Sequence, residues 1–325
     1  MEIISLLHVL FVTLLLITFV FAADDLRKES HILITDRKPS VRRIKSLIGK
    51  PSPSLKSKLC ASVASNQQDK LVACKFIGYS NLKKCLNATI GFATNSPKTV
   101  PIPSQIGLLT RLTSLYVFPL IGKIPSAVGC LTKLTSLALY GSELTGTIPV
   151  SIGSLTNLNT LFLNDNQLTG SIPSSIGSLS RLDRLSLNDN QLTGTIPTFI
   201  GLLTKLTALS VSYNQLGGPI PRSIGSLSKL LTLYLNDNLM TGTMPSSIGS
   251  LSKLTLLDLS KNRLTGTIPF SKGSFAKLSY LFLQDNQLRG TIPSSFCSSG
   301  IGRFIIDCKL IKCACCSESI YDKCP

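Results

Sequence analysis

LTNLNTLFLNDNQLTGSIPSSIG, residues 155–177, decides the fold of this 325-residue chain. Near-copies of it begin every 24 residues from Leu131 to Phe275, and a 22-residue copy begins at Leu109, so eight units span residues 109–298. Ile102-Pro103 to Gly107 matches the closing half of one more unit. A repeat of this quality at a fixed period indicates a solenoid, in which each unit packs only against its neighbours.

The pattern inside one unit predicts how the chain turns. Residues 161–163 (Leu-Phe-Leu) alternate between buried and exposed positions, as in a strand. Asn166 follows, and we expect its amide to bond backbone groups of adjoining turns. Gly170 allows a conformation that a side chain would block, and Pro173 removes a backbone donor after the strand. The same asparagine recurs in the later units, as Asn190, Asn214, Asn238, Asn262 and Asn286.

The two ends of such a stack need caps, and the cysteines predict where the caps lie. We assign residues 59–108 to an N-terminal cap and 299–325 to a Cys-rich C-terminal cap, each stabilised by disulfides. Cys130 lies where later units carry Ser, and with the N-terminal cap it makes an even set: Cys60, Cys74, Cys85 and Cys130. The other set is Cys297, Cys308, Cys313, Cys315, Cys316 and Cys324. The connectivity within each set stays open.

The N-terminus predicts export. Residues 1–22 form a signal peptide with an apolar run from Ile3 to Phe21 and a cleavage site after Ala22 or Ala23. The same run is long enough to span a bilayer, so an uncleaved membrane anchor is the alternative. We expect a protein that is secreted, extracellular or in the cell wall. Asn87-Ala88-Thr89 is the one glycosylation sequon, which favours a glycan on Asn87.

Much of the positive charge precedes the repeats. The net charge is +17, and residues 24–108 hold fifteen Lys or Arg against five Asp or Glu. Residues 23–58 combine this charge with Pro and Ser, which predicts a basic disordered stretch. Nucleic acid is not an expected partner, because the protein is exported and this stretch has almost no aromatic residues. The sequence leaves the oligomeric state open.

The unit resembles the plant-type leucine-rich repeat, most specifically in its Gly-x-Ile-Pro element. Polygalacturonase-inhibiting proteins and receptor-kinase ectodomains carry this repeat, and the resemblance covers residues 102–298. It implies a right-handed α/β-type superhelix with a parallel concave sheet. It also implies extracellular recognition of a protein, a peptide or a wall polysaccharide, in a defence or signalling role. The cysteine patterns of both ends differ from those of the family.

Side chains that point out of the concave strands are the main binding candidates. Aromatic residues on a rigid sheet are good anchors, because they bury area with little loss of entropy. Carboxylates beside them would hold a basic or hydroxyl-rich ligand, although Asn-Asp-Asn is also a well-made turn. The candidates are Tyr116, Phe162, Tyr234, Phe282, Asp165, Asp189, Asp237, Asp258 and Asp285.

Two other surfaces offer a different function, that of a structural or surface-binding protein. A basic edge, with one cation in every unit except the one that carries Asn157, would bind an acidic polysaccharide or a membrane surface, or would be a solvated edge. It consists of Arg111, Lys133, Arg181, Lys205, Lys229, Lys253 and Lys277. Hydroxyls flank the glycine of most units, as Thr145 and Thr147 do, and would match ice or a sugar lattice, or form an ordinary small sheet.

Enzymatic residues are missing from the sequence. Once the signal is removed, His31 is the one histidine left, and no Ser-His-acid set, phosphate loop or regular metal-ligand spacing is present. We therefore predict a binding protein that is no enzyme and has no cofactor or metal.

Overall fold

The computed structural model describes residues 100–269 and 275–292, together with 73, 90–93, 303–307 and 311–313. All described residues belong to one compact unit, residues 49–325. The expected signal peptide or anchor, the basic stretch and Asn87 lie outside the described residues. So do all the cysteine side chains named above except that of Cys130.

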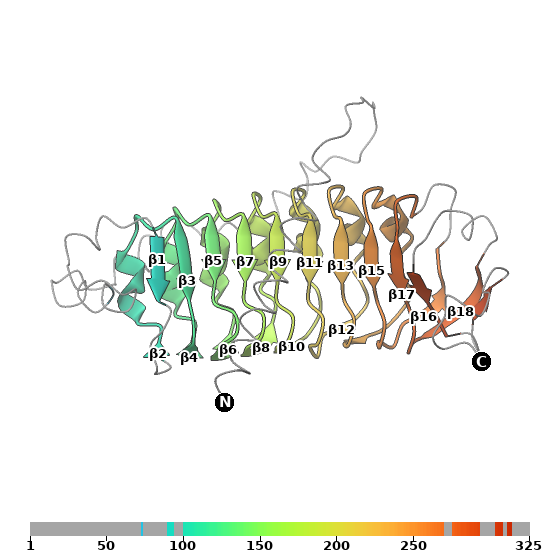
Figure 1. Cartoon of the computed structure of the whole chain (residues 1–325), viewed down its shortest axis with the longest axis horizontal. Coiled ribbons are helices and arrows are strands. Elements are labelled where there is room, and N and C mark those ends of the chain that lie inside the picture. The colour runs from blue at the N-terminus through green and yellow to red at the C-terminus, as the bar shows by residue number, and fades with distance from the viewer. Residues whose placement is uncertain are drawn as a thin grey trace, which may run out of the picture. The chain divides into compact units, whose positions relative to one another are not determined.

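One long parallel sheet takes one strand from every turn of the chain (Figure 1). Neighbouring strands pair in register, as Leu137 with Leu161 and Leu161 with Leu185. The ten strands, in spatial order, are β1 (Ile90–Ala93), β3 (Ser114–Val117), β5 (Ser136–Ala138), β7 (Thr160–Phe162), β9 (Arg184–Ser186), β11 (Ala208–Ser210), β13 (Thr232–Tyr234), β15 (Leu256–Asp258), β17 (Tyr280–Phe282) and β19 (Arg303–Ile305). Because all neighbouring strands of this sheet pair in parallel, the predicted parallel sheet is confirmed.

A second series of short strands follows the first, after the asparagine turn. It forms three smaller parallel sheets, which are interrupted rather than continuous. The first sheet contains β2 (Val100–Pro101), β4 (Leu120–Lys123), β6 (Glu143–Thr147), β8 (Gln167–Ser171) and β10 (Gln191–Thr193). The second sheet contains β12 (Gly217–Gly218) and β14 (Leu239–Met240). The third sheet contains β16 (Thr265–Thr267), β18 (Gln287–Ile292) and β20 (Ile311–Cys313).

Short 3-10 helices return the chain on the opposite side of each turn. They are η2 (Ser104–Leu108), η3 (Ser126–Cys130), η4 (Val150–Ser154), η5 (Ser174–Ser178), η6 (Thr198–Leu202), η7 (Arg222–Ser226) and η8 (Ser246–Ser250). Each follows a proline in extended conformation, such as Pro173 with φ −67°. Proline fits there because its φ is already fixed and a helix start has no use for its missing N–H.

Six of these helices, η2 to η7, pack so closely against the next turn that each needs a glycine. A Cβ on Gly201 would lie 2.5 Å from the backbone oxygen of Ser223 in the next turn. Gly153 and Gly225 meet the same obstacle. The repeated Ile-Gly pair therefore combines a buried side chain with a point of close backbone approach. This close approach explains why glycine recurs there, which the periodicity alone did not.

The core has the predicted composition. Leu161, Leu163 and Ile176 have no exposed surface, whereas Phe162 is half-buried on the other face of the strand. This arrangement confirms the register in which the two leucines of each strand point inward. The same positions form one continuous hydrophobic core along the repeats.

The buried asparagine of each unit joins it to the unit before. Nδ2 of Asn166 donates to the carbonyl of Leu139, at 2.8 Å, and to that of Leu163, at 3.2 Å. Oδ1 of Asn166 accepts from the backbone N–H of Leu144, at 3.0 Å. Later units repeat the pattern, so the expected ladder of amides exists and satisfies backbone groups that would otherwise be buried without partners.

Candidate functional site

The outward residues of the long sheet form one column across its strands, which we call the central column. Strand register pairs them in the order Tyr116, Ala138, Phe162, Ser186, Ser210, Tyr234, Asp258 and Phe282. Neighbours in such a column lie about 4.8 Å apart. Ala138 is 1% exposed although it points outward, because its small side chain lies between Tyr116 and Phe162. The column is therefore a continuous surface with aromatic groups near both ends.

The N-terminal half of this face contains two aromatic residues that the sequence reading missed. The rings of Phe118 and Tyr140 are stacked with centroids 5.6 Å apart. Burial, and to a smaller extent Tyr116, raises the pKa of Tyr140. Phe118 belongs to the shortened first unit, where the period of 24 fails. Its alignment with Tyr140 was therefore hard to see, although both side chains extend the aromatic surface of Tyr116 and Phe162.

The C-terminal half combines aromatic rings with a carboxylate. Asp258 pairs in register with Tyr234 on one side and Phe282 on the other. Its Oδ1 accepts two hydrogen bonds from Ser260, from the backbone N–H at 3.0 Å and from the hydroxyl at 2.7 Å. Burial nevertheless raises the pKa of Asp258, because desolvation outweighs these bonds. Burial, followed by the charge of Asp258, raises the pKa of Tyr234.

The aspartates after the strands have a clear role in the turn. Asp165, Asp189, Asp237 and Asp285 are all left-handed, with φ between 52° and 59°. Asp and Asn tolerate this conformation better than most residues. Asp237 also forms an ion pair with Lys261, at 3.1 Å. The turn thus accounts for aspartate at these positions, and a binding role for them remains a proposal.

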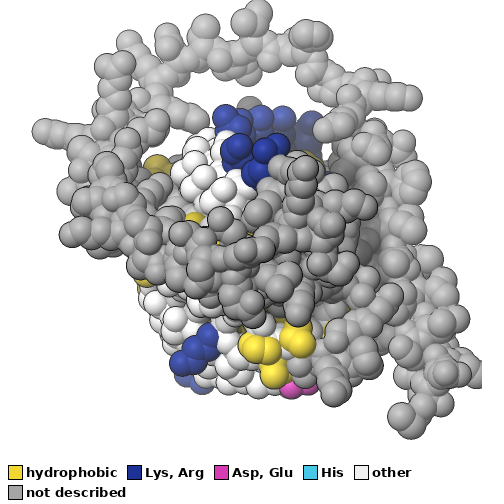
Figure 2. Space-filling view, turned by 90° about the vertical axis from the view of Figure 1, so that its left-hand side faces the viewer, with side chains coloured by type: hydrophobic (Ala, Val, Ile, Leu, Met, Phe, Trp, Pro, Cys, Tyr) yellow, Lys and Arg dark blue, Asp and Glu magenta, His cyan; other side chains and the backbone are white. Residues whose placement is uncertain are grey.

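The seven cations of the basic edge are all exposed, and six of them, all but Lys277, lie between a 3-10 helix and the following strand. None of the seven forms an ion pair with another described residue. Figure 2, turned to face the β1 side of Figure 1, shows a patch of Lys and Arg side chains at the top of the described part and a smaller group at the lower left. Asn157 interrupts the row, and its amide donates to the carbonyl of Thr132 at 2.9 Å. This edge offers a row of uncompensated positive charge.

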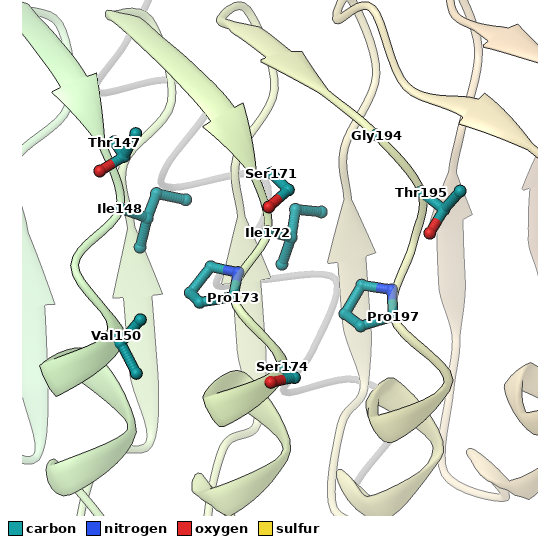
Figure 3. A pocket seen from close by; sticks show the side chains of 10 residues that line it. All are labelled: Thr147, Ile148, Val150, Ser171, Ile172, Pro173, Ser174, Gly194, Thr195 and Pro197. Carbon is teal, nitrogen blue, oxygen red and sulfur yellow. The ribbon is translucent and has the colours of Figure 1, made fainter.

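The hydroxyl residues beside the second strands line a shallow groove. Thr147, Ser171 and Thr195 occupy equivalent positions in three successive turns (Figure 3). With the adjacent prolines, such as Pro173, and the exposed Val150, they enclose about 650 Å³. The hydroxyl array, which also contains Thr169, Thr193, Thr241, Thr243, Thr265 and Thr267 beside Thr145, is interrupted at residues 217–219, Gly-Gly-Pro.

The described residues include no group of three or more His, Cys, Asp or Glu that would hold a metal ion. They also include no helix that is both long and apolar enough to cross a membrane. Cys130 is disulfide-bonded, and the position of its partner in the N-terminal cap remains a prediction.

Comparison with known proteins identifies the repeats. The Leucine rich repeat family matches residues 132–192, 204–264 and 228–288. No curated protein sequence matches the chain. Among solved structures, the plant peptide hormone receptor RGFR1 in complex with RGF2 is 36% identical, with a TM-score of 0.65 over 70% of this chain. The ectodomain of the plant receptor kinase GASSHO1/SCHENGEN3 from Arabidopsis thaliana, in complex with CASPARIAN STRIP INTEGRITY FACTOR 2, is 35% identical, with a TM-score of 0.62 over 66%.

The similarity covers only part of these receptors. This chain spans 37% of the RGFR1 chain and 26% of the GASSHO1/SCHENGEN3 chain. A plant ice-binding protein is 26% identical, with a TM-score of 0.51, and the match covers 78% of this chain and 99% of that one. The repeats, the parallel sheets and these neighbours together show a leucine-rich-repeat solenoid that is similar to the ectodomains of plant receptor kinases.

Proposed function

We propose that this chain is an extracellular recognition module that binds a peptide or a protein on its concave sheet, and that it is no enzyme. The observation that carries the proposal is the central column, in which Tyr116, Phe162, Tyr234 and Phe282 are half-buried and point away from the core. Half-buried rings lose little freedom when a ligand covers them, and aromatic residues dominate the binding energy of many interfaces.

The sheet beneath the column favours binding without rearrangement. Each outward ring lies between two buried aliphatic residues of its strand, as Phe162 lies between Leu161 and Leu163. The asparagine ladder fixes the turn that follows each strand. A surface that is already ordered spends less free energy on ordering when it binds.

The structural neighbours support the same class of ligand. Both receptors described above were solved in complex with a partner, RGF2 in one case and CASPARIAN STRIP INTEGRITY FACTOR 2 in the other. Because this chain spans about a third of those receptors, we propose only the general class, a secreted peptide or an extracellular protein. A wall polysaccharide on the same face would meet the same aromatic residues.

A pull-down from extracellular material tests the proposal. The full chain is immobilised beside a variant with Phe162→Ala, Tyr234→Ala and Phe282→Ala, and captured molecules are identified by mass spectrometry. We expect a species that the native chain retains and the triple variant loses. Ser186→Ala with Ser210→Ala is the matched control, since both serines lie in the same column without rings. Equal retention by native chain and triple variant would refute the concave site.

A second function, binding to an ice surface, is favoured by one specific comparison. The plant ice-binding protein is matched over almost its whole length, and exposed hydroxyls recur once per turn at Thr147, Ser171 and Thr195. Ice recrystallisation assays test this function on the native chain and on the double variant Thr147→Lys, Thr195→Lys. Inhibition that the double variant loses would establish this function, and absence of inhibition by the native chain would exclude it.

A further inference from the structure

The C-terminal half of the concave face is acidic, although the chain as a whole has a net charge of +17. Asp258 and Asp285 lie on this half, and neither forms an ion pair with a described residue. Lys261 lies beside them, but its ammonium group is held by Asp237 at 3.1 Å. Three carboxylates on this half, those of Asp237, Asp258 and Asp285, thus share the one cation Lys261 among the described side chains, which leaves a net negative charge that complements a basic ligand.

Aromatic side chains surround the carboxylate of Asp258. Tyr234 and Phe282 are its two neighbours in the central column, so their strands lie about 10 Å apart with Asp258 between them. In the neighbouring outward column, Leu256 pairs with Tyr280, which is 45% exposed. The carboxylate thus lies in a surface of rings and aliphatic groups rather than in open water.

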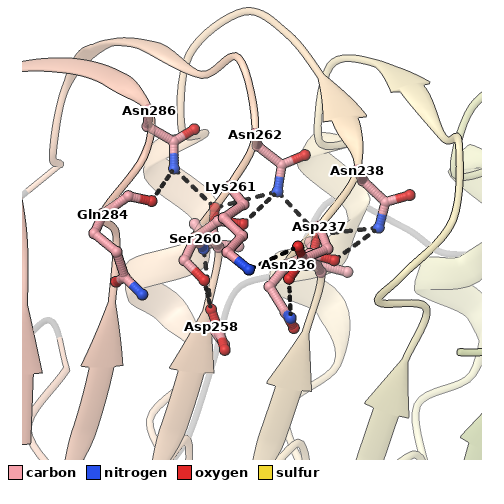
Figure 4. Close-up of polar contacts among 11 residues, drawn as sticks. Asn236, Asp237, Asn238, Asp258, Ser260, Lys261, Asn262, Gln284 and Asn286 are labelled. Carbon is pink, nitrogen blue, oxygen red and sulfur yellow. Dashed lines mark hydrogen bonds and ion pairs between the residues drawn. The ribbon is translucent and has the colours of Figure 1, made fainter. Parts of the chain in front are cut away.

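One carboxylate oxygen of Asp258 has no hydrogen-bond donor. Both bonds from Ser260 go to Oδ1 of Asp258, and Oδ2 accepts none from the described residues. Oδ2 is not fully buried, whereas Oε1 of Gln284 and the hydroxyl of Thr232 are buried and have no hydrogen-bond partner among the described residues. Gln284 lies in the turn after β17, beside the turn of Ser260 and Lys261 (Figure 4), and its carbonyl accepts a hydrogen bond from the N–H of Lys261. A ligand that brings a donor can therefore pair with Oδ2 of Asp258.

We propose that Tyr234, Asp258, Tyr280 and Phe282 form a subsite, the acidic aromatic patch, for the guanidinium group of an arginine side chain in a peptide ligand. The inference rests on the proposed function and names the chemistry of one ligand residue. A guanidinium group is planar, stacks on aromatic faces and carries several donors in a fixed plane. Asp258 provides the charge and, in Oδ2, an unpaired acceptor, while the rings of Tyr234 and Phe282 provide cation–π contacts.

A small probe tests the patch directly. Acetyl-Gly-Arg-Gly-amide is titrated into the full chain and followed by NMR, beside the same peptide with citrulline or with lysine in place of arginine. Citrulline keeps the shape of arginine and removes its charge. We expect shifts confined to residues 232–284, and binding at least tenfold weaker for citrulline and for lysine. Equal binding of citrulline would overturn the proposal, and equal binding of lysine would overturn the choice of guanidinium.

Two carboxylate variants locate the site. Asp258→Asn keeps an acceptor for Ser260 and removes the charge, so binding of the arginine peptide should fall at least tenfold. Glu143→Gln is the matched control, because it removes one carboxylate at an exposed position of β6, which does not belong to the long sheet. It should bind as the native chain does. Circular dichroism verifies that both variants fold. A loss of binding in Glu143→Gln as large as in Asp258→Asn would mean a general charge effect and refute the patch.

The outcome can be separated from that of the proposed function. If the pull-down finds a partner that the triple aromatic variant loses, while Asp258→Asn and the citrulline peptide change nothing, the concave site stands and the guanidinium subsite fails. If the arginine peptide binds as expected but no partner depends on the aromatic residues, the subsite stands and the proposed function fails.

Discussion

Asn214 accepts a hydrogen bond from the backbone N–H of Leu192, 22 residues earlier, at 2.9 Å. Its amide also donates to the carbonyl of Leu187 at 3.0 Å and to that of Val211 at 3.2 Å. One side chain thus closes its own turn and attaches it to the turn before. The repeats depend on these attachments because a single unit buries too little apolar surface to fold alone.

Replacing Asn214 by Ala should therefore destabilise the stack. The change leaves the N–H of Leu192 and at least one carbonyl buried without partners, each at a cost of about 1–3 kcal/mol. We expect the free energy of unfolding, measured with denaturant, to fall by about 3 kcal/mol. Asn164→Ala is the control, since the side chain of Asn164 bonds only Asp165. Similar losses in both variants would contradict the role of the ladder.

Gly201 should tolerate no side chain. In Gly201→Ala the new Cβ would lie 2.5 Å from the Ser223 oxygen and 2.7 Å from its Cβ, so the two 3-10 helices must separate. Thermal unfolding should show a clear fall in the melting temperature. Gly217→Ala is the matched change, because its nearest neighbour would be 3.7 Å away, and its melting temperature should stay within a few degrees of the native value.

The stability of the fold should depend on Asp258 and pH in a particular direction. Burial raises the pKa of Asp258 in the folded state. As the pH falls through that raised pKa, the folded chain takes up a proton before the unfolded chain does, which stabilises the folded state. Asp258→Asn cannot gain from this protonation. We therefore expect Asp258→Asn to unfold at higher denaturant than the native chain at pH 7, and the difference to shrink towards pH 4. A difference that is constant with pH would contradict the burial effect.

The basic edge predicts binding that salt abolishes. If an acidic polysaccharide binds there, Lys205→Ala, Lys229→Ala and Lys253→Ala together should weaken retention on polygalacturonate, because three exposed charges in one row are removed. Exposed charges are screened beyond about 8 Å at physiological ionic strength, so retention should also fall as salt rises. The triple aromatic variant should be retained as the native chain is. Retention that resists salt, or that requires Phe162, would assign the polymer to the concave face.

Much of the fold follows from the spacing of residues. A period of 24 fixes one strand per turn, and the alternation around Phe162 fixes which face it occupies. The strand at residues 90–93 escaped prediction, because the preceding segment lacks the repeated leucines and Gly91 occupies the position of Leu115. The burial of Ala138 depends on the size of its two neighbours in other turns, which no pattern within a unit specifies.

The candidate site was less accessible to sequence reasoning than the fold. Its columns could be written down from the register, since the period places Tyr234, Asp258 and Phe282 side by side. The sequence could not show that Asp237 forms an ion pair with Lys261, whereas Asp258 forms none with a described residue. Asp237 and Lys261 occupy the same left-handed turn position in adjacent units, while Asp258 is partly buried on the strand.

The link from Asn214 back to Leu192 also has a consequence for how such a chain changes in length. Since each unit is joined in the same way to the one before, removal of 24 residues, such as 179–202, would bring one unit against an equivalent partner and preserve every core contact by type. The loss would shift the far part of the binding face by a single strand spacing, about 4.8 Å. The number of units between Phe162 and Tyr234 thus sets the distance between these two side chains, and a change in that number needs no change in the residues of the core.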